Sequence, residues 1–223
     1  LCGRRALVTS GPTHEPIDPV RYIANRSSGK QGHAIAGALA RMGAETVLVS
    51  GPTYQPDPAG VSVLRVESAD QMLKACENAL PVDVAVCAAA VADWRPAAAA
   101  PSKIKKNSKA KKNGKPPEIK LTENPDILAR LSAAGNRRPR LVVGFAAETE
   151  RVIENARAKL AAKGCDWIAA NDVSGAQGTF GGDFNAIHLV TAGGEVESWP
   201  TLAKTAVAQR LAERIAGALE QVK

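Results

Sequence analysis

The sequence predicts an α/β protein in which a single doubly wound, mostly parallel sheet carries helices on both faces. Short apolar runs rich in valine and alanine alternate along the chain with stretches whose apolar residues repeat at helical spacing. This alternation is typical of parallel strands joined by crossover helices. The 223 residues are 45% hydrophobic but only 4% aromatic, which is enough for a large aliphatic core. We therefore expect one Rossmann-like three-layer domain spanning residues 1–223.

The first β-α-β unit is the clearest of these elements. Strands are predicted at Arg5–Ser10 and at Thr46–Ser50, and each is followed by a Gly-Pro pair that ends it. Between them, apolar residues at helical spacing follow Ser27-Ser28-Gly29, and Gly43 stands where the helix should stop.

The same alternation continues to the end of the chain and closes with a hairpin and an amphipathic helix. A strand at Val61–Val66 is followed by a helix with a capping box of Ser68 and Gln71 and by a strand at Asp83–Ala90. The next helix runs from the N-cap Asn124 through Pro125 and Asp126 to about Ala134, and a strand at Leu141–Ala146, a helix from about Thr149 to Lys163 and a strand at Asp166–Ala170 follow it. The chain then forms a β-hairpin of Ala186–Thr191 and Glu195–Trp199 around Gly193-Gly194, and ends in a helix whose buried face carries Leu202, Val207, Leu211 and Ile215.

Four of the predicted strands lead into segments of unusual composition. The carboxyl ends of parallel strands lie at one edge of a sheet, so these segments should converge there and form the ligand site. For the Asn-Asp segment, ordinary turn chemistry is an equally good explanation. The segments are Thr9-Ser10-Gly11-Pro12-Thr13, Ala90-Val91-Ala92-Asp93, Gly144-Phe145-Ala146-Ala147-Glu148 and Ala170-Asn171-Asp172.

The segment Asn25-Arg26-Ser27-Ser28-Gly29-Lys30 precedes a predicted helix. Free backbone N–H groups, serine hydroxyls and the positive end of a helix dipole suit a phosphate group. The segment matches neither G-x-x-x-x-G-K-[ST] nor G-x-G-x-x-G, because Gly29 and Gly32 lack the other glycines in register. Its residues alone leave two interpretations open, a helix cap and an anion site.

The formal net charge of +7 comes from one segment. Between Pro101 and Pro117 there are seven lysines and no acidic residue, so the rest of the chain is formally neutral. This segment has no periodicity, which predicts a flexible flap over about 101–120. A flap could bring a lysine to nucleotide phosphates and exclude water, but a solvated tether or a nonspecific polyanion-binding segment would have the same composition. The lysines are Lys103, Lys105, Lys106, Lys109, Lys111, Lys112 and Lys115.

The sequence gives little support for metal-centre, disulfide or hydrolase chemistry. Cys2, Cys76, Cys87 and Cys165 form no C-x-x-C pair and are expected to be reduced. The three histidines are dispersed, and no nucleophile elbow is present. No apolar stretch approaches the roughly 18 residues of a membrane span, so we expect a cytoplasmic protein without a membrane partner. Because the chain begins at Leu1 rather than methionine, we expect it to be part of a longer polypeptide.

Seven motifs occur in order along nearly the whole chain. They are Thr9-Ser-Gly-Pro-Thr13, Glu15-Pro-Ile-Asp-Pro-Val-Arg-Tyr-Ile23, Asn25-Arg-Ser-Ser-Gly-Lys30, Ala89-Ala-Val-Ala-Asp93, Lys103-Ile-Lys-Lys106, Asn124-Pro-Asp-Ile127 and Gly144-Phe-Ala-Ala-Glu-Thr149. Together they resemble bacterial phosphopantothenoylcysteine synthetase. In that family the synthetase is usually the C-terminal half of a bifunctional protein whose N-terminal half is a flavin-dependent decarboxylase. The resemblance implies that FMN belongs only to the missing half. It also implies a homodimer in which the phosphopantothenate site includes residues of the neighbouring subunit.

The resemblance implies a CTP-dependent ligase that acts in coenzyme A biosynthesis. The carboxylate of 4′-phosphopantothenate attacks the α-phosphorus of CTP and releases pyrophosphate. The amine of cysteine then attacks the acyl-cytidylate, which yields an amide and CMP. By the match, Asn25 is the catalytic asparagine that converts the acyl-cytidylate, and Lys103 is the flap lysine that helps to form it and contacts CTP.

The resemblance also implies a CTP site and a divalent cation. Mg²⁺ or Mn²⁺ is expected to be held mainly by the triphosphate, and Asp93 is the one candidate protein ligand. Lys159 and Lys163 share one face of a predicted helix, which alone would indicate only a solvated face. Arg26 departs from the histidine expected in close relatives, and the lysine content after Lys106 is unusually high. The residues expected to bind CTP besides Lys103 are Gly11, Ser27, Ser28, Gly29, Ala89, Ala90, Asp93, Asn124, Pro125, Asp126, Ile127, Phe145, Lys159 and Lys163.

Three other functions compete with this interpretation. An ATP-using synthetase is the first, because base selection rests on backbone contacts that a sequence does not display; the bacterial-type Lys103-Ile-Lys-Lys106 favours CTP. A nucleic-acid-binding module is disfavoured because the positive charge is confined to one segment, and we expect no nucleic-acid partner. A nicotinamide oxidoreductase is disfavoured because the G-x-G-x-x-G motif is missing.

Overall fold

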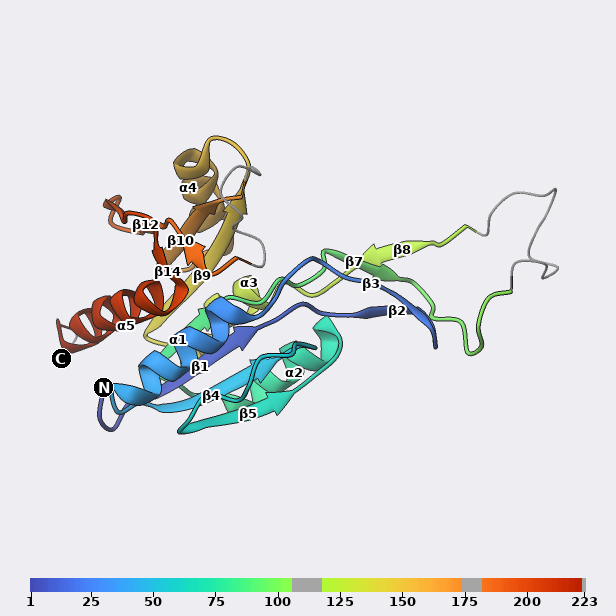
Figure 1. The fold of residues 1–223 in the computed structure, drawn as a ribbon, viewed down its shortest axis with the longest axis horizontal. Helices are drawn as coiled ribbons and strands as arrows, with labels where there is room; N and C mark the ends of the chain where they lie inside the picture. The colour runs from blue at the N-terminus through green and yellow to red at the C-terminus, as the bar shows by residue number, and fades with distance from the viewer. Residues whose placement is uncertain (106–117, 174–181, 222–223) are drawn as a thin grey trace.

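The computed structural model describes residues 1–105, 118–173 and 182–221, and its centre is a large mixed sheet (Figure 1). Within these residues eight strands pair in the order β13-β12-β10-β9-β6-β1-β4-β5. The strands from β5 to β10 are parallel, whereas β12 and β13 are antiparallel. The predicted doubly wound fold is therefore confirmed. The strands are β1 (Arg5–Ser10), β4 (Glu45–Ser50), β5 (Val61–Arg65), β6 (Val84–Cys87), β9 (Leu141–Glu148), β10 (Trp167–Asp172), β12 (His188–Thr191) and β13 (Val196–Ser198).

The strand β1 marks the point where the strand order reverses. The chain crosses from β1 to β4 on one side, and later returns to place β6 on the other side. The two crossovers diverge here, so the carboxyl ends of β1 and β6 border an open crevice, which is where doubly wound proteins bind ligands.

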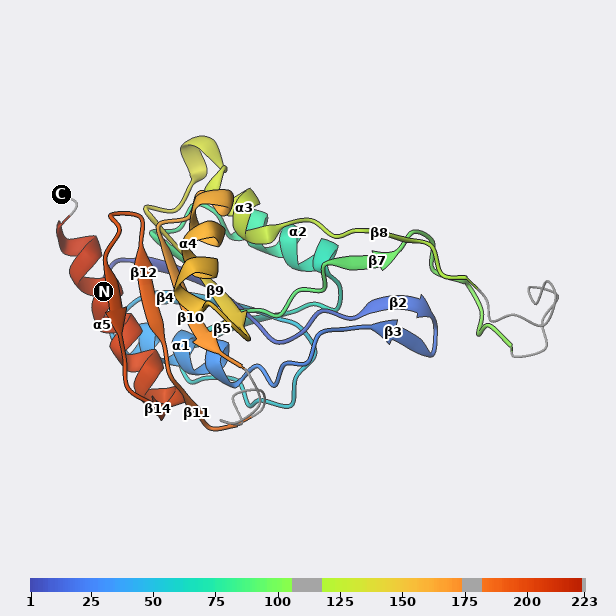
Figure 2. The ribbon, with the colours of Figure 1, turned by 90° about the horizontal axis from the view of Figure 1, so that it is seen from above.

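Helices cover both faces of the sheet (Figures 1 and 2). The alternation of side chains along a strand decides which face each residue packs on: Val8 packs with α1 and α5, while Leu7 packs with α2 and α3. None of the described helices is long and apolar enough to cross a membrane. The helices are α1 (Lys30–Arg41), α2 (Ala69–Ala79), α3 (Ile127–Ser132), α4 (Val152–Lys163) and α5 (Lys204–Gln221), with a 3-10 turn η2 at Gly135–Arg137.

The helix α1 lies unusually close to β1. A Cβ atom at Gly32 would stand 2.4 Å from Oγ of Ser10, so only glycine allows the helix to begin directly above the end of the strand. The approach brings the first turn of α1 to the crevice.

Two short antiparallel pairs extend away from the sheet (Figures 1 and 2). We call β2 (Glu15–Asp18), β3 (Arg21–Ile23), β7 (Trp94–Pro96) and β8 (Leu121–Glu123) the arm. The N–H of Ala100 donates to the carbonyl of Ile17 at 2.9 Å and links its two pairs. The sequence analysis missed the arm, because strands of three or four residues are too short to show a clear alternation, and two of them, β2 and β7, contain proline. A third small pair, β11 (Phe184–Asn185) with β14 (Leu202–Ala203), precedes α5.

Several predicted boundaries are wrong. The strand predicted at Asp83–Ala90 ends at Cys87, where its pairing with β1 also ends. The segment Gly144–Glu148 belongs to β9 rather than to a loop, because pairing with β10 continues to Glu148. For the same reason, Ala170-Asn171-Asp172 lies within β10. Leu202 lies in β14, before the last helix begins.

The start of α3 also differs from the prediction. Asp126, not Asn124, caps the helix by accepting from the N–H of Ala129 at 3.0 Å. The helix ends at Ser132 rather than near Ala134. Asn124 does not cap the helix because its Oδ1 accepts from Arg95 at 3.1 Å, while its Nδ2 donates to the carbonyl of Ala92 at 2.7 Å. The predicted capping box of Ser68 and Gln71 at α2 is confirmed.

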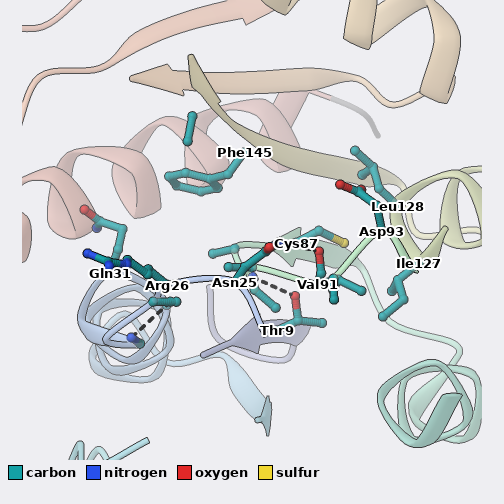
Figure 3. A pocket seen from close by; sticks show the side chains of 18 of the residues that line it. Thr9, Asn25, Arg26, Gln31, Cys87, Val91, Asp93, Ile127, Leu128 and Phe145 are labelled. Carbon is teal, nitrogen blue, oxygen red and sulfur yellow. Dashed lines mark hydrogen bonds between the residues drawn. The ribbon is translucent and has the colours of Figure 1, made fainter. Parts of the chain in front are cut away.

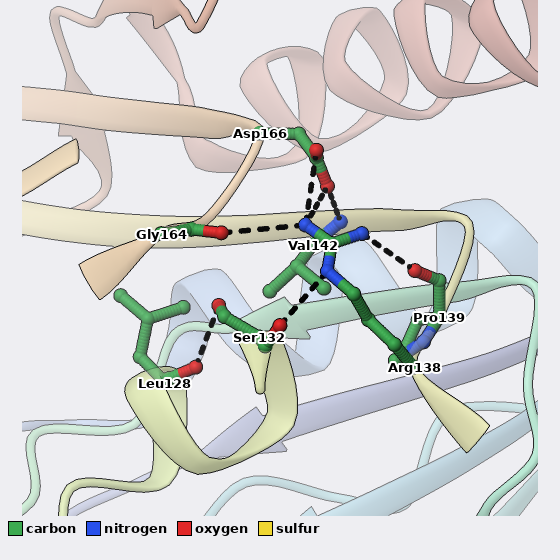
Figure 4. Close-up of polar contacts among 7 residues, drawn as sticks. All are labelled: Leu128, Ser132, Arg138, Pro139, Val142, Gly164 and Asp166. Atoms are coloured by element: carbon green, nitrogen blue, oxygen red, sulfur yellow. Dashed lines mark hydrogen bonds and ion pairs between the residues drawn. The ribbon is translucent and has the colours of Figure 1, made fainter. Parts of the chain in front are cut away.

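Arg138 holds the elements at the opposite end of β9 together (Figure 4). Its guanidinium donates to both carboxylate oxygens of Asp166 at 3.0 Å, to the carbonyl of Ser132 at 2.9 Å and to that of Gly164 at 3.3 Å. Asp166 in turn accepts from the N–H of Val142 at 2.7 Å. These bonds join the end of α3, the end of α4 and the start of β9.

Candidate functional site

A cleft of about 970 Å³ opens at the carboxyl ends of β1, β6, β9 and β10 (Figure 3). All four segments that were predicted to converge contribute to its lining, through Thr9, Ala90, Phe145 and Asn171 among others. The convergence is thus confirmed. The predicted site residues that line the cleft are Asn25, Ser27, Ser28, Gly29, Ala89, Ala90, Asp93, Asn124, Pro125, Asp126, Ile127, Phe145, Lys159 and Lys163.

Two predicted site residues do not line the cleft. Gly11 is buried below it with φ of 76°, and its carbonyl accepts from the N–H of Ala90 at 2.9 Å. Gly11 therefore supports the loop after β6 from beneath. Lys103 is exposed next to the arm, where the N–H of Ile104 donates to Asp18 at 3.1 Å. The predicted flap residues 106–117, with Lys106 and the four lysines after it, lie outside the described residues.

The loop before α1 presents backbone N–H groups to the cleft. Gly29 is the N-cap residue, with φ of 74°, and has no side chain of its own to cap the helix. The hydroxyl of Ser27 accepts from the N–H of Gly29 at 3.3 Å, and the hydroxyl of Ser28 accepts from the N–H of Lys30 at 3.5 Å. The residues of the first turn, Lys30 to Gly32, line the cleft. Backbone N–H groups in the first turn of a helix suit an anion, so the position of this turn in the cleft favours the anion site over the helix cap, the two interpretations that the sequence left open.

A buried histidine stabilises this loop from below. Nδ1 of His33 lies 3.0 Å from Oγ of Ser10 and 3.0 Å from the carbonyl oxygen of Gly29. The tautomer with the proton on Nδ1 satisfies that carbonyl, and Ser10 donates to the same oxygen at 2.9 Å. Burial lowers the pKa of His33, and the hydrogen bond to Gly29 opposes this shift only in part. The imidazole is therefore neutral at pH 7.

The loop after β6 is held by side chains from the loop after β1. Oγ1 of Thr9 accepts from the N–H of Ala89 at 3.2 Å, and Oγ1 of Thr13 accepts from the N–H of Ala92 at 3.1 Å. From the other side of the crevice, Nδ2 of Asn25 donates to the carbonyl of Val91 at 2.9 Å (Figure 3). Three side chains thus fix the backbone that carries Ala89, Ala90 and Asp93.

Asp93 and Asn124 have different functions in the lining. The N–H of Asn124 donates to the carbonyl of Asp93 at 2.9 Å, and Oδ1 of Asn124 accepts from Arg95 at 3.1 Å. Asn124 therefore uses its side chain to hold the loop. The carboxylate of Asp93 is exposed at the rim, so it can meet a cation or a donor on a ligand.

A charged wall comes from α3 and α4. Lys159 and Lys163 both line the cleft, which confirms that they share one face of the helix. Nζ of Lys163 donates to Oδ2 of Asp126. Burial raises the pKa of Asp126, but the N–H of Ala129 and the ammonium group of Lys163 lower it more, so the net shift is downward. Asp126 is therefore ionised and offsets part of the lysine charge.

The apolar part of the cleft contains Phe145, Cys87 and Leu128. Figure 3 shows the ring of Phe145 on the β9 side and Asn25 on the α1 side. Burial raises the pKa of the Cys87 thiol well above its usual value, so this cysteine is uncharged at neutral pH. An aromatic ring facing polar backbone is suited to a flat ligand group such as a nucleobase.

The sequence analysis missed several lining residues. Asn171 had been named only in a segment for which turn chemistry was an equally good explanation. Lys30 had been named only as the last residue of the candidate anion segment, and Gln31, Asn185 and Lys204 were not selected, although all four line the cleft. The only available signal for Gln31 was its position directly after that segment. Nothing in the sequence relates Asn185 or Lys204 to residues more than 150 positions away.

The carboxylates of the cleft suit a metal ion that is held mainly by the phosphates of a bound substrate. Within the described residues, no group of three or more His, Cys, Asp and Glu side chains could hold a metal ion. Mg²⁺ commonly takes one or two carboxylates and completes its shell with substrate phosphates and water. The isolated carboxylate of Asp93 matches that mode.

Comparisons with known proteins identify the family of this chain. Residues 1–219 match the family described as "DNA/pantothenate metabolism flavoprotein C-terminal domain". The "Coenzyme A biosynthesis bifunctional protein CoaBC" of Vibrio cholerae is 44% identical over 209 residues, which are 93% of this chain and 51% of that protein. The protein of the same name from Escherichia coli K12 is 48% identical over 184 residues, 82% of this chain and 44% of that protein.

A solved structure shows the same fold over the full length. The crystal structure of the C-terminal domain of a CoaBC protein superposes with a TM-score of 0.80 at 39% identity, and covers 99% of this chain and 98% of that one. The chain spans about half the length of the curated relatives it matches. The match over nearly all residues, together with the cleft at the switch point, shows that the chain belongs to the DNA/pantothenate metabolism flavoprotein C-terminal domain family.

Proposed function

We propose that this chain is a phosphopantothenate–cysteine ligase of coenzyme A biosynthesis, which uses CTP and passes through an acyl-cytidylate. The observation that carries the proposal is the meeting, in one cleft, of the α1 N-terminus, Asn25, Asp93 and Phe145 with Lys159 and Lys163. The relatives are named for coenzyme A biosynthesis, which supports the pathway.

The first half-reaction joins two anions, so positive groups must balance their charge. A carboxylate oxygen of 4′-phosphopantothenate attacks the α-phosphorus of CTP, and the bond to pyrophosphate breaks. The N–H groups at the start of α1 and the ammonium groups of Lys159 and Lys163 make the cleft positive and would attract the triphosphate. When bound, Mg²⁺ neutralises part of the phosphate charge, with Asp93 as its candidate protein ligand. Lys103 lies outside the cleft in this structure, so its proposed contact with CTP requires its segment to move.

The second half-reaction needs a donor near the acyl carbonyl. The amine of cysteine attacks the acyl carbon, loses a proton, and CMP leaves. Charge builds on the carbonyl oxygen as the amine adds, and a fixed N–H donor stabilises that charge. Nδ2 of Asn25 has two hydrogens, of which the bond to Val91 uses one. The second hydrogen is the proposed donor.

Phe145 and the backbone of the loop after β6 can contact a base, and the same groups could accept adenine, so an ATP-using ligase is the second candidate. Direct comparison of the two nucleotides decides between them.

The proposal extends to the state of the protein in the cell. We propose that it is a cytoplasmic homodimer, fused in the full-length polypeptide to a decarboxylase that carries FMN. Exposed apolar side chains on the arm, namely Tyr22 and Leu121, and next to it, namely Val20 and Ile119, support an interface with a second copy. The relatives, which are bifunctional and about twice as long, support the fusion.

One assay tests the proposed reaction. Pyrophosphate release is measured with 4′-phosphopantothenate and either CTP or ATP, with and without cysteine, and CMP and the amide product are identified by mass spectrometry. The proposal expects release with CTP before cysteine is added and amide only afterwards. Pyrophosphate release with ATP but not with CTP would mean that ATP, not CTP, is the nucleotide substrate. No release with either nucleotide would refute the ligase activity.

A further inference from the structure

Two long helices begin at the same end of the cleft, and each begins with a lysine. Lys30 is the first residue of α1, Lys204 is the first residue of α5, and both line the cleft. The positive ends of the two helix dipoles add to the charge of the ammonium groups. The α1/α5 end of the cleft is therefore strongly positive.

This positive charge is costly in the absence of an anion. Lys204 is only 9% exposed. Burial lowers the pKa of Lys204, the ammonium group of Lys30 lowers it further, and Asp183 acts in the opposite direction. Two like charges that are partly removed from water gain stability from a negative group placed between them.

Asp183 supplies one such negative group. Nζ of Lys30 donates to Oδ1 of Asp183 at 2.6 Å, and the N–H of Lys204 donates to the carbonyl of Asp183 at 2.8 Å. The hydrogen bond from Lys30 lowers the pKa of Asp183. The Asp183 side chain is nevertheless 75% exposed, so water competes for it and the ion pair is weak.

A chain of amides next to the lysines ends in an unpaired acceptor. Nε2 of Gln31 donates to the carbonyl of Lys204 at 3.1 Å, so Oε1 of Gln31 is left to accept from Nδ2 of Asn185 at 3.5 Å. These bonds fix the orientation of Asn185, which lines the cleft and is 5% exposed. Its Oδ1 has no partner among the residues that the structure describes. A buried acceptor of this kind indicates a ligand that brings an O–H or N–H donor.

We propose that Lys30 and Lys204, with Asn185, form a subsite for a phosphate group of a ligand that also carries a hydroxyl donor, and that Asp183 takes the place of the phosphate when no ligand is bound. Both CTP and 4′-phosphopantothenate combine a phosphate with hydroxyl groups. The identity of the ligand therefore rests on the proposed function, whereas the subsite itself rests on the contacts above.

Because Asp183 competes with the ligand, replacing Lys30 and replacing Asp183 should change the binding affinity in opposite directions. Lys30→Gln removes a charged donor and should weaken phosphate binding about tenfold. Asp183→Asn removes the internal competitor and should tighten binding about threefold. A residue that merely stabilised the fold would not improve binding when it is replaced.

The experiment is titration calorimetry of the intact protein with inorganic pyrophosphate and, separately, with 4′-phosphopantothenate. Asp57→Asn is the matched control, because it makes the same charge change in an exposed ion pair with Arg65, at 2.7 Å, outside the cleft lining. We expect this control to bind like the wild type. The Asp183→Asn effect should also shrink at high salt, where ion pairs are screened.

The two ligands distinguish the sources of the phosphate. If Lys30→Gln weakens the binding of pyrophosphate but not of 4′-phosphopantothenate, the subsite holds the triphosphate. If it weakens the binding of 4′-phosphopantothenate but not of pyrophosphate, the subsite holds the phosphate of that substrate. Unchanged binding of both ligands overturns the subsite, and weaker or equal binding by Asp183→Asn overturns the competition. Neither titration requires turnover, so a protein that shows these binding effects but releases no pyrophosphate from CTP or ATP would refute the ligase and keep the subsite.

Discussion

The side-chain amide of Asn25 donates a 2.9 Å hydrogen bond to the main-chain carbonyl of Val91. The bond spans the crevice between the loop before α1 and the loop after β6, so one residue joins the two halves of the switch point. Any change at Asn25 thus affects both the chemistry proposed for its amide and the shape of the cleft, and a useful test must separate them.

Asn25→Asp should allow acyl-cytidylate to form but slow its conversion to the cysteine amide by about 100-fold or more, the range found when one oxyanion donor is removed. A carboxylate offers only acceptors, and it repels the charge that builds on the acyl oxygen. The measurement is single-turnover mass spectrometry with CTP and 4′-phosphopantothenate, followed by addition of cysteine.

Thr13→Val is the control for a loosened loop. It removes the 3.1 Å bond to the N–H of Ala92 without touching the proposed acyl site, and should slow both half-reactions to a similar, small extent. If Asn25→Asp behaves like Thr13→Val, Asn25 is only a structural residue.

Lys103→Gln should slow acyl-cytidylate formation without lowering the melting temperature, because an exposed side chain contributes little to stability. In the structure its neighbour Ile104 is held by Asp18 and by Arg21, at 3.1 Å each. Those two bonds must break if Lys103 is to reach the cleft. Pyrophosphate release in a single turnover measures the step.

Lys105→Gln is the matched control, since Lys105 is also exposed, lies two residues away and carries the same charge. It should release pyrophosphate at nearly the wild-type rate. Equal slowing in both variants would mean that only the overall charge of the segment matters.

Gly32→Ala should destabilise the protein by about 1–3 kcal/mol, the usual cost of overpacking, because the new Cβ would stand 2.5 Å from Cβ of Ser10. The displacement of α1 should also weaken nucleotide binding. Gly217→Ala is the matched control, since Gly217 lies in α5 with no atom within 4 Å of the new Cβ. It should stabilise the helix by about 0.5–1 kcal/mol. Urea unfolding measures both, and a Gly32→Ala variant as stable as wild type would contradict the close approach.

The stability contributed by neutral His33 should fall as the pH drops below about 6.5, the pKa of an unfolded histidine. Burial holds the folded pKa lower, so the unfolded state binds more protons in this range and stability rises with pH. His33→Asn keeps a donor for the Gly29 carbonyl but cannot titrate, and should show a smaller loss of stability between pH 7.5 and 5.5. Equal pH dependence in wild type and His33→Asn would refute the prediction.

The sequence determined the order of strands and helices in the main body of the protein, because periodicity and turn residues are local signals. It placed β1 to within a residue, anticipated the capping box at α2, and identified the segments whose ends meet, since all parallel strands end at one edge. The resemblance then supplied fourteen of the residues that line the cleft.

Only the tertiary structure decided which residues from distant parts of the chain complete the site. Asp126 rather than Asn124 caps α3, because the Asn124 side chain is bound to Ala92 and Arg95. Strands β9 and β10 run on past their predicted ends, because each extends the pairing of the other. Lys204 and Asn185 reach the α1 end of the cleft through sheet order and helix packing, which are long-range contacts that leave no periodic trace in the sequence.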